Sequence, residues 1–326
     1  MSTIERAAAR LGSIVKRDRD ASRDREKDRE RLEPEFRAVD PAAAEANPTL
    51  NETRKSDVAP IESLSNGDGA RASNGRRCAR VELDLPALTA RGFITPANSE
   101  TELATDFRRI KRPLLLAIKK VEASDGRENP ANLIVVTSSL PGEGKTFTSL
   151  NLAFSIAAEM DRSVLLVDGD VAKSAVAEVL GVTPEIGLTD VLNRGGGGID
   201  DAVMATNVPG LELLSSGPRL PNTDELFASE MMRRVMRQLA DRDPRRLVLV
   251  DAPPLLARTE APNVARLASQ VVVVVEADKT PQASVTEALS LLQGCENVSL
   301  ILNKVTRRAS DRYTYGYGYG YGARGN

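Results

Sequence analysis

Short runs of apolar, β-branched residues recur along the chain from about residue 99 onward. Five of them stand out, at 133–136, 164–167, 247–250, 271–275 and 298–302. They are continuous rather than alternating, which is typical of parallel strands that are covered on both faces of a sheet. Segments with helical periodicity lie between them, for example 147–160 and 225–240. The pattern predicts an α/β fold with a doubly wound, mostly parallel sheet and right-handed crossover connections.

The first 96 residues lack this pattern and predict an N-terminal extension. Apolar residues recur at helical spacing from Ile4 to Val15, after a stretch with the spacing of a capping box, and indicate one short amphipathic helix. Such a helix cannot bury its apolar face by itself. It therefore either docks on a partner or packs on its own chain, and the sequence leaves both alternatives open.

The rest of the extension is mostly polar. Residues 16–31 interleave 8 basic with 6 acidic residues, which is typical of a solvated helix or a disordered spacer. Residues 40–77 are rich in Ala, Pro, Asn, Ser and Gly and indicate a linker, whereas 81–96 are apolar enough to pack on the edge of a domain. We therefore expect an extension over 1–96, a folded domain over 97–306 and a low-complexity tail over 307–326.

Composition excludes several classes of function. The 326 residues include no His and no Trp, so chemistry that depends on histidine is excluded. A net charge of −2 gives no sign of nucleic-acid binding. The two cysteines lie far apart without metal-ligand spacing and indicate a reducing compartment. The longest apolar run, at 271–275, is far shorter than the ~20 residues that span a bilayer. Because the first residues also lack the apolar core of a signal peptide, we expect a soluble, cytoplasmic chain.

A glycine-rich turn follows the first predicted strand of the domain. It reads SLPGEGKT over 139–146 and continues into a helical segment. Such a turn exposes backbone N–H groups at the positive end of a helix dipole, where phosphate oxygens bind. Lys145 would reach the β- and γ-phosphates, and the Thr146 hydroxyl would ligate Mg²⁺. Ser139 stands where the motif has its first glycine, so an accidental glycine turn is the alternative. The residues assigned to nucleotide binding are Pro141, Gly142, Glu143, Gly144, Lys145, Thr146 and Phe147.

Carboxylates follow two further predicted strands. Asp168 and Asp170 end the second strand, where their i and i+2 spacing points them to the same side, and Asp251 ends the third. The carboxyl ends of parallel strands lie at one edge of the sheet, so we expect these acids to converge on the glycine-rich turn. One or two carboxylates together with substrate phosphates suit Mg²⁺, which leaves one carboxylate free to act on a nucleophile.

All five tyrosines of the chain lie in one nine-residue window near its end. They alternate with glycine or threonine over 313–321. A low-complexity extension without a role is the alternative to a functional tail. The positions concerned are Tyr313, Tyr315, Tyr317, Tyr319 and Tyr321.

In their order along the chain, these motifs resemble those of the bacterial tyrosine kinases, a family unrelated in fold to eukaryotic protein kinases. The resemblance covers about 97–326. More narrowly, the opening MSTIERAAARLG, the segment FRRIKRPLL and the YGYGYG ending resemble the tyrosine autokinases of exopolysaccharide/PEP-CTERM (exosortase-associated) loci. The resemblance to the bacterial tyrosine kinases implies a P-loop NTPase fold of the deviant-Walker (SIMIBI-like) type. It also implies an ATP-dependent protein-tyrosine autokinase that regulates exopolysaccharide biosynthesis and export.

The resemblance also implies roles for single residues. Lys145 contacts the phosphates, Asp168 contacts the tyrosine hydroxyl and accepts its proton, and Asn303 contacts the adenine. The tail tyrosines are the autophosphorylated cluster. The magnesium ligands that it implies are Thr146, Asp170 and Asp251.

A homo-oligomer is implied as well, a ring in which the tail of one copy enters the site of its neighbour. Arg108 and Lys111 stand at the two basic positions of the family's Glu-x-x-Arg-x-x-Arg pattern, but Thr105 stands at its acidic position. The second acidic motif departs too, because its usual basic residue is Ala172 here and Lys173 follows one position later.

Further partners follow from the same resemblance. Related kinases are fused to, or activated by, a transmembrane polysaccharide chain-length (co-polymerase) protein. The resemblance thus implies a separate membrane activator, a tyrosine phosphatase, and a place at the inner face of the cell membrane through the activator. No nucleic-acid partner is expected.

The charge of the tail suggests a switch. Residues 304–326 contain five basic residues and one acidic residue, a net charge of +4. About 18 flexible residues have an r.m.s. span of ~25 Å, enough to reach a neighbouring copy at an effective concentration on the order of millimolar. Each phosphate adds about −1.5 to −2, so a fully modified tail would be repelled by a pocket of phosphates and carboxylates. Our hypothesis is that the unmodified tail holds neighbours together and the phosphorylated tail releases them.

Two other functions remain as alternatives. One is a partition- or septum-positioning ATPase, a class that carries a signature lysine where this chain has Leu140. The other is a non-catalytic, nucleotide-gated adaptor of a polysaccharide exporter, which would bind ATP without labelling the tail.

Overall fold

The computed structural model of the protein describes residues 79–122, 129–243 and 245–306. Its sheet has eight strands in the order β1-β4-β5-β3-β6-β2-β7-β8, and every neighbouring pair is parallel except β4–β5. The five predicted strands are confirmed as β2, β3, β6, β7 and β8. The strands are β1 (Ala79–Val81), β2 (Leu133–Ser138), β3 (Ser163–Asp168), β4 (Val203–Thr206), β5 (Leu211–Leu214), β6 (Arg246–Asp251), β7 (Gln270–Glu276) and β8 (Val298–Asn303).

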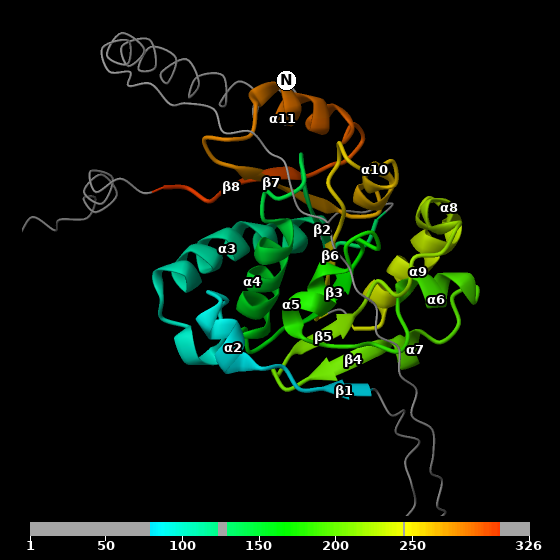
Figure 1. Ribbon diagram of the computed structural model, residues 1–326, viewed down its shortest axis with the longest axis horizontal. Coiled ribbons are helices and arrows are strands. Elements are labelled where there is room, and N and C mark those ends of the chain that lie inside the picture. The colour runs from blue at the N-terminus through cyan, green and yellow to red at the C-terminus, as the bar shows by residue number, and fades with distance from the viewer. Residues whose placement is uncertain (1–78, 123–128, 244, 307–326) are drawn as a thin grey trace, which may run out of the picture. The chain divides into compact units, whose positions relative to one another are not determined.

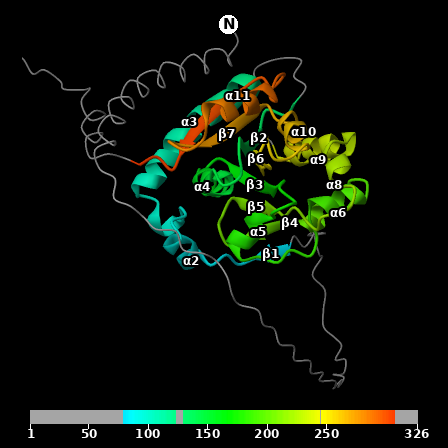
Figure 2. The same cartoon turned by 45° about the horizontal axis from the view of Figure 1, so that its top comes forward.

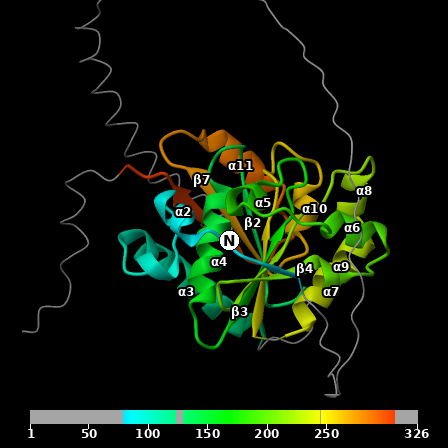
Figure 3. The same ribbon diagram turned by 60° about the horizontal axis from the view of Figure 1, so that its bottom comes forward.

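Helices cover both faces of this sheet (Figure 3). One face carries α2 (Leu85–Ala90), α3 (Glu102–Glu122), α4 (Lys145–Ala157) and α5 (Ala175–Leu180). The other carries α6 (Leu188–Asn193), α7 (Ile199–Ala202), α8 (Thr223–Phe227), α9 (Glu230–Asp241), α10 (Ala261–Ala265) and α11 (Gln282–Ser290). The predicted doubly wound α/β fold is thus confirmed, with the helices arranged around the sheet as Figure 1 shows.

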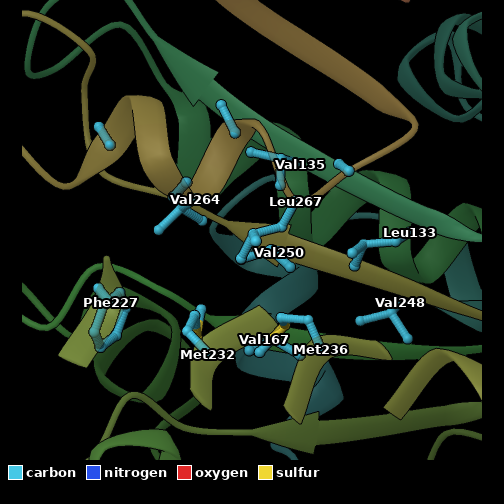
Figure 4. Close-up of a cluster of buried hydrophobic side chains, with 14 of the residues drawn as sticks. Leu133, Val135, Val167, Phe227, Met232, Met236, Val248, Val250, Val264 and Leu267 are labelled. Atoms are coloured by element: carbon cyan, nitrogen blue, oxygen red, sulfur yellow. The ribbon is translucent and has the colours of Figure 1, made fainter. Parts of the chain in front are cut away.

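Because helices cover both faces of the sheet, the central strands are apolar at successive positions and not only at alternate ones. Successive side chains of a strand point to opposite faces, so Leu133 and Val135 of β2 enter one core while Ile134 and Val136 enter the other. All four are fully buried. The first core, which also contains Met232 and Met236 of α9, is drawn in Figure 4. Each fully buried aliphatic side chain stabilises the fold by roughly 1.5–3 kcal/mol, so the central strands are held firmly.

Residues 79–96 pack on the domain that follows them. β1 pairs with β4, and Leu88, Phe93 and Ile94 are buried in the second core. The Ile94 N–H donates to Asn151 Oδ1 of α4 at 2.7 Å. The predicted packing of 81–96 on a domain edge therefore takes the form of a strand and a short helix, and the compact unit begins before residue 97. The predicted helix at 4–15 lies outside the described residues.

Candidate functional site

The glycine-rich turn joins the buried strand β2 to helix α4 at the carboxyl edge of the sheet. Gly142 and Gly144 have φ angles of 88° and 95°, which an L side chain rarely adopts. Gly144 is also crowded, because a Cβ atom there would clash with Nδ2 of Asn303. The turn therefore requires glycine at both positions, and α4 begins directly after it, at Lys145.

Glu143 holds the turn in shape. Its side chain is 2% exposed and accepts a hydrogen bond from the Leu140 N–H at 2.6 Å. The Thr280 hydroxyl and the Glu276 N–H donate to its other oxygen. Both oxygens of the Glu143 carboxylate are thus occupied by hydrogen bonds within the protein. In the predicted nucleotide site, Glu143 would therefore contribute its backbone and not its side chain.

Lys145 lies in the middle of a cluster of carboxylates. Its Nζ is 2.8 Å from Asp170 Oδ2 and 3.7 Å from Asp251 Oδ2. Burial by itself lowers the pKa of the Lys145 ammonium, but the negative charges around it outweigh this effect and raise the pKa above its usual value. Lys145 is therefore a protonated cation that lies directly behind the glycine-rich turn.

Two hydroxyls of α4 donate to Asp251. Thr146 Oγ1 lies 2.8 Å from Asp251 Oδ2, and Ser149 Oγ lies 2.9 Å from Oδ1. Burial raises the pKa of Asp251, although Lys145 and the two hydroxyls act in the opposite direction. The sequence predicted Thr146 but not Ser149, which follows Thr146 by three residues and so lies on the same face of the helix.

Asp168 is fully buried next to Asp251. The two residues are partners in the β3–β6 pairing, so their side chains end neighbouring strands at the same level. Asp168 accepts from the Asp170 N–H at 3.1 Å and from the Val176 N–H at 3.3 Å. Burial and the charge of Asp251 raise the pKa of Asp168 to about 7. A carboxylate with this pKa can accept a proton near neutral pH.

The predicted convergence of the three acids and the turn is present in the structure. Three carboxylates surround one ammonium, so the cluster has an excess of negative charge when all groups are ionised. The residues fit a magnesium ion, because the Thr146 hydroxyl and the Asp251 carboxylate are hard oxygen ligands close together. Within the described ranges no set of three or more carboxylates or thiols forms a complete metal cage.

A cavity of about 380 Å³ opens above the turn. Lys145, Thr146 and Asp170 line it, and so do Lys173 and Arg258, which are less buried than Lys145 and Asp170 and which we call the rim cations. Neither rim cation has a side-chain partner among the residues that the structure describes. Sequence reasoning noted Lys173 only as a displaced basic residue and missed Arg258, which follows Asp251 by seven residues in an irregular segment. The full lining is Pro141, Gly142, Gly144, Lys145, Thr146, Phe147, Asp170, Ala172, Lys173, Pro254, Ala257 and Arg258.

Asn303 and Lys304 hold the outer side of the turn. Asn303 Nδ2 donates to the Glu143 carbonyl at 2.9 Å, and Lys304 Nζ donates to the Gly142 carbonyl at 2.7 Å. Asn303 does not line the cavity above the turn. It lines a second groove, of about 600 Å³, between β8 and α3, to which Phe147 also contributes. Phe147 thus lines both spaces, and adenine contact by Asn303 stays a prediction.

The two residues predicted at an oligomer interface differ in exposure. Arg108 is exposed, and its guanidinium donates to the Ser99 carbonyl and the Thr105 hydroxyl, both at 2.8 Å. Lys111 is 6% exposed, donates to the Ser155 carbonyl at 2.7 Å and forms an ion pair with Glu159. Lys111 is therefore committed to its own chain because α3 packs that side of the helix against α4. The interface role of both residues stays a prediction. The exposed position of Arg108 is compatible with it, whereas the buried position of Lys111 does not support it.

The five tail tyrosines lie outside the described residues. Among the described helices, none is long and apolar enough to cross a membrane.

Comparison with known proteins identifies similar chains. Residues 131–305 match the family model described as "AAA domain". Tyrosine-protein kinase YwqD of Bacillus subtilis (strain 168) is 32% identical over 184 residues, which are 56% of this chain and 76% of YwqD. Tyrosine-protein kinase etk of Escherichia coli (strain K12) is 33% identical over 222 residues, 68% of this chain but 28% of that longer protein.

Among solved structures, the kinase domain of the Escherichia coli tyrosine kinase ETK is similar. It superimposes with a TM-score of 0.57 at 27% identity, over 74% of this chain and 94% of that domain.

Proposed function

Since the chain belongs to the family of bacterial tyrosine-protein kinases, we propose that it transfers the γ-phosphate of ATP to the tyrosines of its own C-terminal tail. The observation that carries the proposal is the cluster of Lys145, Asp168 and Asp251 behind the glycine-rich turn, next to a cavity of suitable size. The cluster offers a cation for phosphates, oxygen ligands for a metal and a carboxylate with a pKa near 7.

Each residue of the site has a role in this reaction. The backbone of 141–146 cradles the phosphates and Lys145 turns from Asp170 toward the β- and γ-oxygens. Mg²⁺, when bound, neutralises the phosphates, and Thr146, Asp170 and Asp251 are the residues that would hold it. Ser149 fixes the orientation of the Asp251 carboxylate through its 2.9 Å hydrogen bond.

Asp168 is the proposed base. The phenol proton of a tail tyrosine passes to the Asp168 carboxylate as the phenol oxygen forms a bond to the γ-phosphorus. The bond between this phosphorus and the β,γ-bridging oxygen breaks, and ADP leaves with the electron pair. The products are ADP and tyrosine phosphate, and the proton on Asp168 is lost to solvent.

Phosphorylation in trans, within a ring-like homo-oligomer, is part of the proposal. Strand β8, the last one described, ends at Asn303, and Tyr313, the first tyrosine of the tail, follows ten residues later. Transfer between copies gives the reaction its regulatory meaning, because a copy can be modified only when it has a neighbour.

The proposed setting is exopolysaccharide biosynthesis and export. We propose a separate transmembrane chain-length protein as activator, a tyrosine phosphatase that reverses the modification, and a cytoplasmic position at the inner face of the membrane. The relatives' names support the kinase activity, whereas these partners rest on the resemblance to autokinases of such loci.

Labelling with γ-³²P-ATP tests the proposal. Wild-type protein should incorporate label into tyrosine, whereas Lys145→Met and a variant with all five tail tyrosines changed to Phe should not. ATP hydrolysis without label in the wild type would favour the partition-type ATPase. Nucleotide binding without either reaction would favour the nucleotide-gated adaptor.

A further inference from the structure

A second surface of the protein carries a concentration of positive charge far from the glycine-rich turn. It lies where α3 meets the connection from α4 to β3, next to a groove of about 780 Å³. We name it the α3 groove and define it by Arg108, Arg112, Leu116, Lys119, Arg162 and Arg245. α4 starts at the turn and ends beside this groove, so the length of α4 separates the two sites.

The charge of the α3 groove is not balanced locally. Besides the five basic residues that define it, Lys111, Glu159 and Asp161 also line the groove, which gives a net formal charge of +4 in a chain whose net charge is −2. Lys111 is paired with Glu159, and Arg245 has a long contact of 3.8 Å with Asp243. Arg112, Lys119 and Arg162, by contrast, have no side-chain partner within the described part of the chain. The groove therefore suits an anion with several charges.

Apolar side chains stand exposed among these cations. Leu116 is 59% exposed on α3, and Met160 is fully exposed between two residues that line the groove. Large apolar side chains with this exposure are few among the described residues. A ligand that combines a dianion with an aromatic ring would use both features, since a guanidinium binds phosphate in a bidentate manner and the ring covers apolar surface.

The chain itself supplies such a ligand nearby. The described residues end at Thr306, just past β8, and the end of β8 shares a groove with the N-terminal half of α3. Figures 1 and 2 show α3 and β8 on the same side of the molecule. The remaining 20 residues contain the five tyrosines.

From these observations we propose that the phosphorylated tail docks in the α3 groove of its own chain. The inference rests on the proposed autophosphorylation. Before modification the tail is repelled by the groove, because residues 307–326 contain four basic residues and one acidic residue, a net charge of +3. Each phosphate adds about −1.5 to −2, so three phosphates reverse the sign of the tail and make the two surfaces complementary.

The lengths are compatible with docking in cis. The path from Val305 across α3, ~10–12 Å wide, and along ~15 Å from Asp106 to Leu116 is roughly 27 Å. Eight extended residues, from Val305 to Tyr313, span at most ~26–29 Å, and Tyr315 to Tyr321 lie further along. The tail therefore reaches the groove without any unfolding of β8.

The spacing of the phosphates also matches the helix. In an extended tail the alternate residues Tyr315, Tyr317 and Tyr319 stand ~6.6 Å apart. On α3 the cations Arg108 and Arg112 are one turn apart, and Lys119 follows two turns after Arg112, with ~5.4 Å per turn. A repeat of tyrosine and glycine can thus place two successive phosphates against Arg108 and Arg112, which stand ~6 Å apart along α3. The third phosphate then lies between Arg112 and Lys119, while the glycines keep the backbone close.

Docking would hold the product away from the phosphate cavity. A phosphorylated tail captured on its own α3 can no longer enter the site of a neighbouring copy. Binding of the phosphorylated tail in the α3 groove would thus couple tail phosphorylation to the release of neighbouring copies.

A binding measurement tests the docking independently of the kinase reaction. The probe is a fluorescent synthetic peptide of residues 307–326 with phosphotyrosine at 315, 317 and 319. It is titrated against full-length protein whose five tyrosines are replaced by Phe, so that the protein's own tail cannot be modified. We expect saturable binding of the phosphopeptide and at least tenfold weaker binding of the unmodified peptide. In Arg112→Glu/Lys119→Glu, phosphopeptide affinity should fall about tenfold or more. Arg219→Glu/Arg234→Glu, which reverses the charge of two exposed arginines elsewhere, is the matched control and should bind normally.

Cis docking is checked with a protein whose tail is made chemically, by ligation of the same phosphopeptide to residues 1–306. Its own tail should compete, so added probe should bind at least tenfold more weakly than to the Tyr→Phe protein, at any protein concentration. Equal binding of both peptides, or unchanged binding in the Arg112/Lys119 variant, would overturn the proposal. The proposal would also be overturned if the protein bound phosphatidylglycerol vesicles but not the phosphopeptide, and if the Arg112/Lys119 variant lost this vesicle binding. A failure of autophosphorylation would appear only in the γ-³²P-ATP assay and would leave these measurements unaffected.

Discussion

Asp168 and Asp251 are strand partners at the ends of β3 and β6, yet their surroundings differ. Asp251 accepts hydrogen bonds from two hydroxyl groups, whereas the donors to Asp168 among the described residues are two backbone N–H groups, at 3.1 and 3.3 Å. Two neighbouring carboxylates in different environments suit different tasks. Asp251 is equipped to hold a metal ion, and Asp168 is equipped to take up a proton.

The pH dependence of tail phosphorylation should reflect this difference. A base acts when it is deprotonated, and the pKa of Asp168 is raised to about 7 by burial and by Asp251. The initial rate of labelling should therefore increase about tenfold per pH unit below 7 and level off above it. Bound magnesium would lower the midpoint, because a cation stabilises the carboxylate. A labelling rate that decreases as pH rises from 5.5 to 7 would exclude Asp168 as the base.

The same raised pKa predicts a stability effect. The folded chain holds the Asp168 proton more tightly than the unfolded chain, so the free energy of unfolding decreases as pH rises from about 4 to about 7. In the absence of nucleotide and metal, Asp168→Asn should therefore raise Tm at pH 8 by at least ~3 °C. The gain should shrink toward pH 4, where Asp168 of the folded wild-type protein is fully protonated and the unfolded chain also begins to bind the proton. Thermal unfolding followed by circular dichroism at both pH values gives the comparison, and an equal difference at both would contradict the pKa.

Gly144 and Asn303 should show coupled effects. Gly144→Ala places a methyl group against Asn303 Nδ2 and also forces φ = 95° on an L residue, which costs ~1–2 kcal/mol. We expect ATP affinity to fall at least tenfold. Adding Asn303→Ala removes the clash but not the strain, so the double variant should be more stable to urea than the Gly144→Ala protein. If adding Asn303→Ala to Gly144→Ala left the free energy of unfolding unchanged, this result would contradict the close approach of residues 144 and 303.

The rim cations of the phosphate cavity should affect the reaction more than binding. Lys173 and Arg258 line the cavity and would lie near a phosphoryl group bound in it, where positive side chains are often decisive for transfer. Arg258→Ala should lower the labelling rate about tenfold or more, with less than a threefold change in Kd for ATP, and Arg258→Lys should recover part of the rate. Arg219→Ala serves as the control. Equal losses of rate and affinity would instead indicate ordinary nucleotide binding.

The central part of the fold could be predicted because its sequence signals are local. β2, β3, β6, β7 and β8 are continuous apolar runs, and the glycines at 142 and 144 report a backbone that other residues rarely adopt. β4 and β5 were missed because each has only four residues, and β1 has three. Such strands are fixed by pairing with distant neighbours, which a local pattern does not contain.

The site was predicted to a similar extent. The residues at strand ends were found because topology brings the ends of parallel strands together. Ser149 and Arg258 were missed because their roles depend on helix rotation and on the course of an irregular segment. The burial of Lys111 was missed because Glu159 and Ser155, which bind it, lie more than forty residues away.

Transfer between copies is the central claim, and mixing two inactive proteins tests it most directly. One protein carries Lys145→Met and an intact tail, and the other has a working site but all five tail tyrosines changed to Phe. They are mixed with ATP and Mg²⁺, and phosphotyrosine is located by mass spectrometry. The account predicts phosphate on residues 313–321 of the Lys145→Met protein and none when either protein is incubated alone. ATP hydrolysis in the mixture with every tail tyrosine unmodified would contradict it.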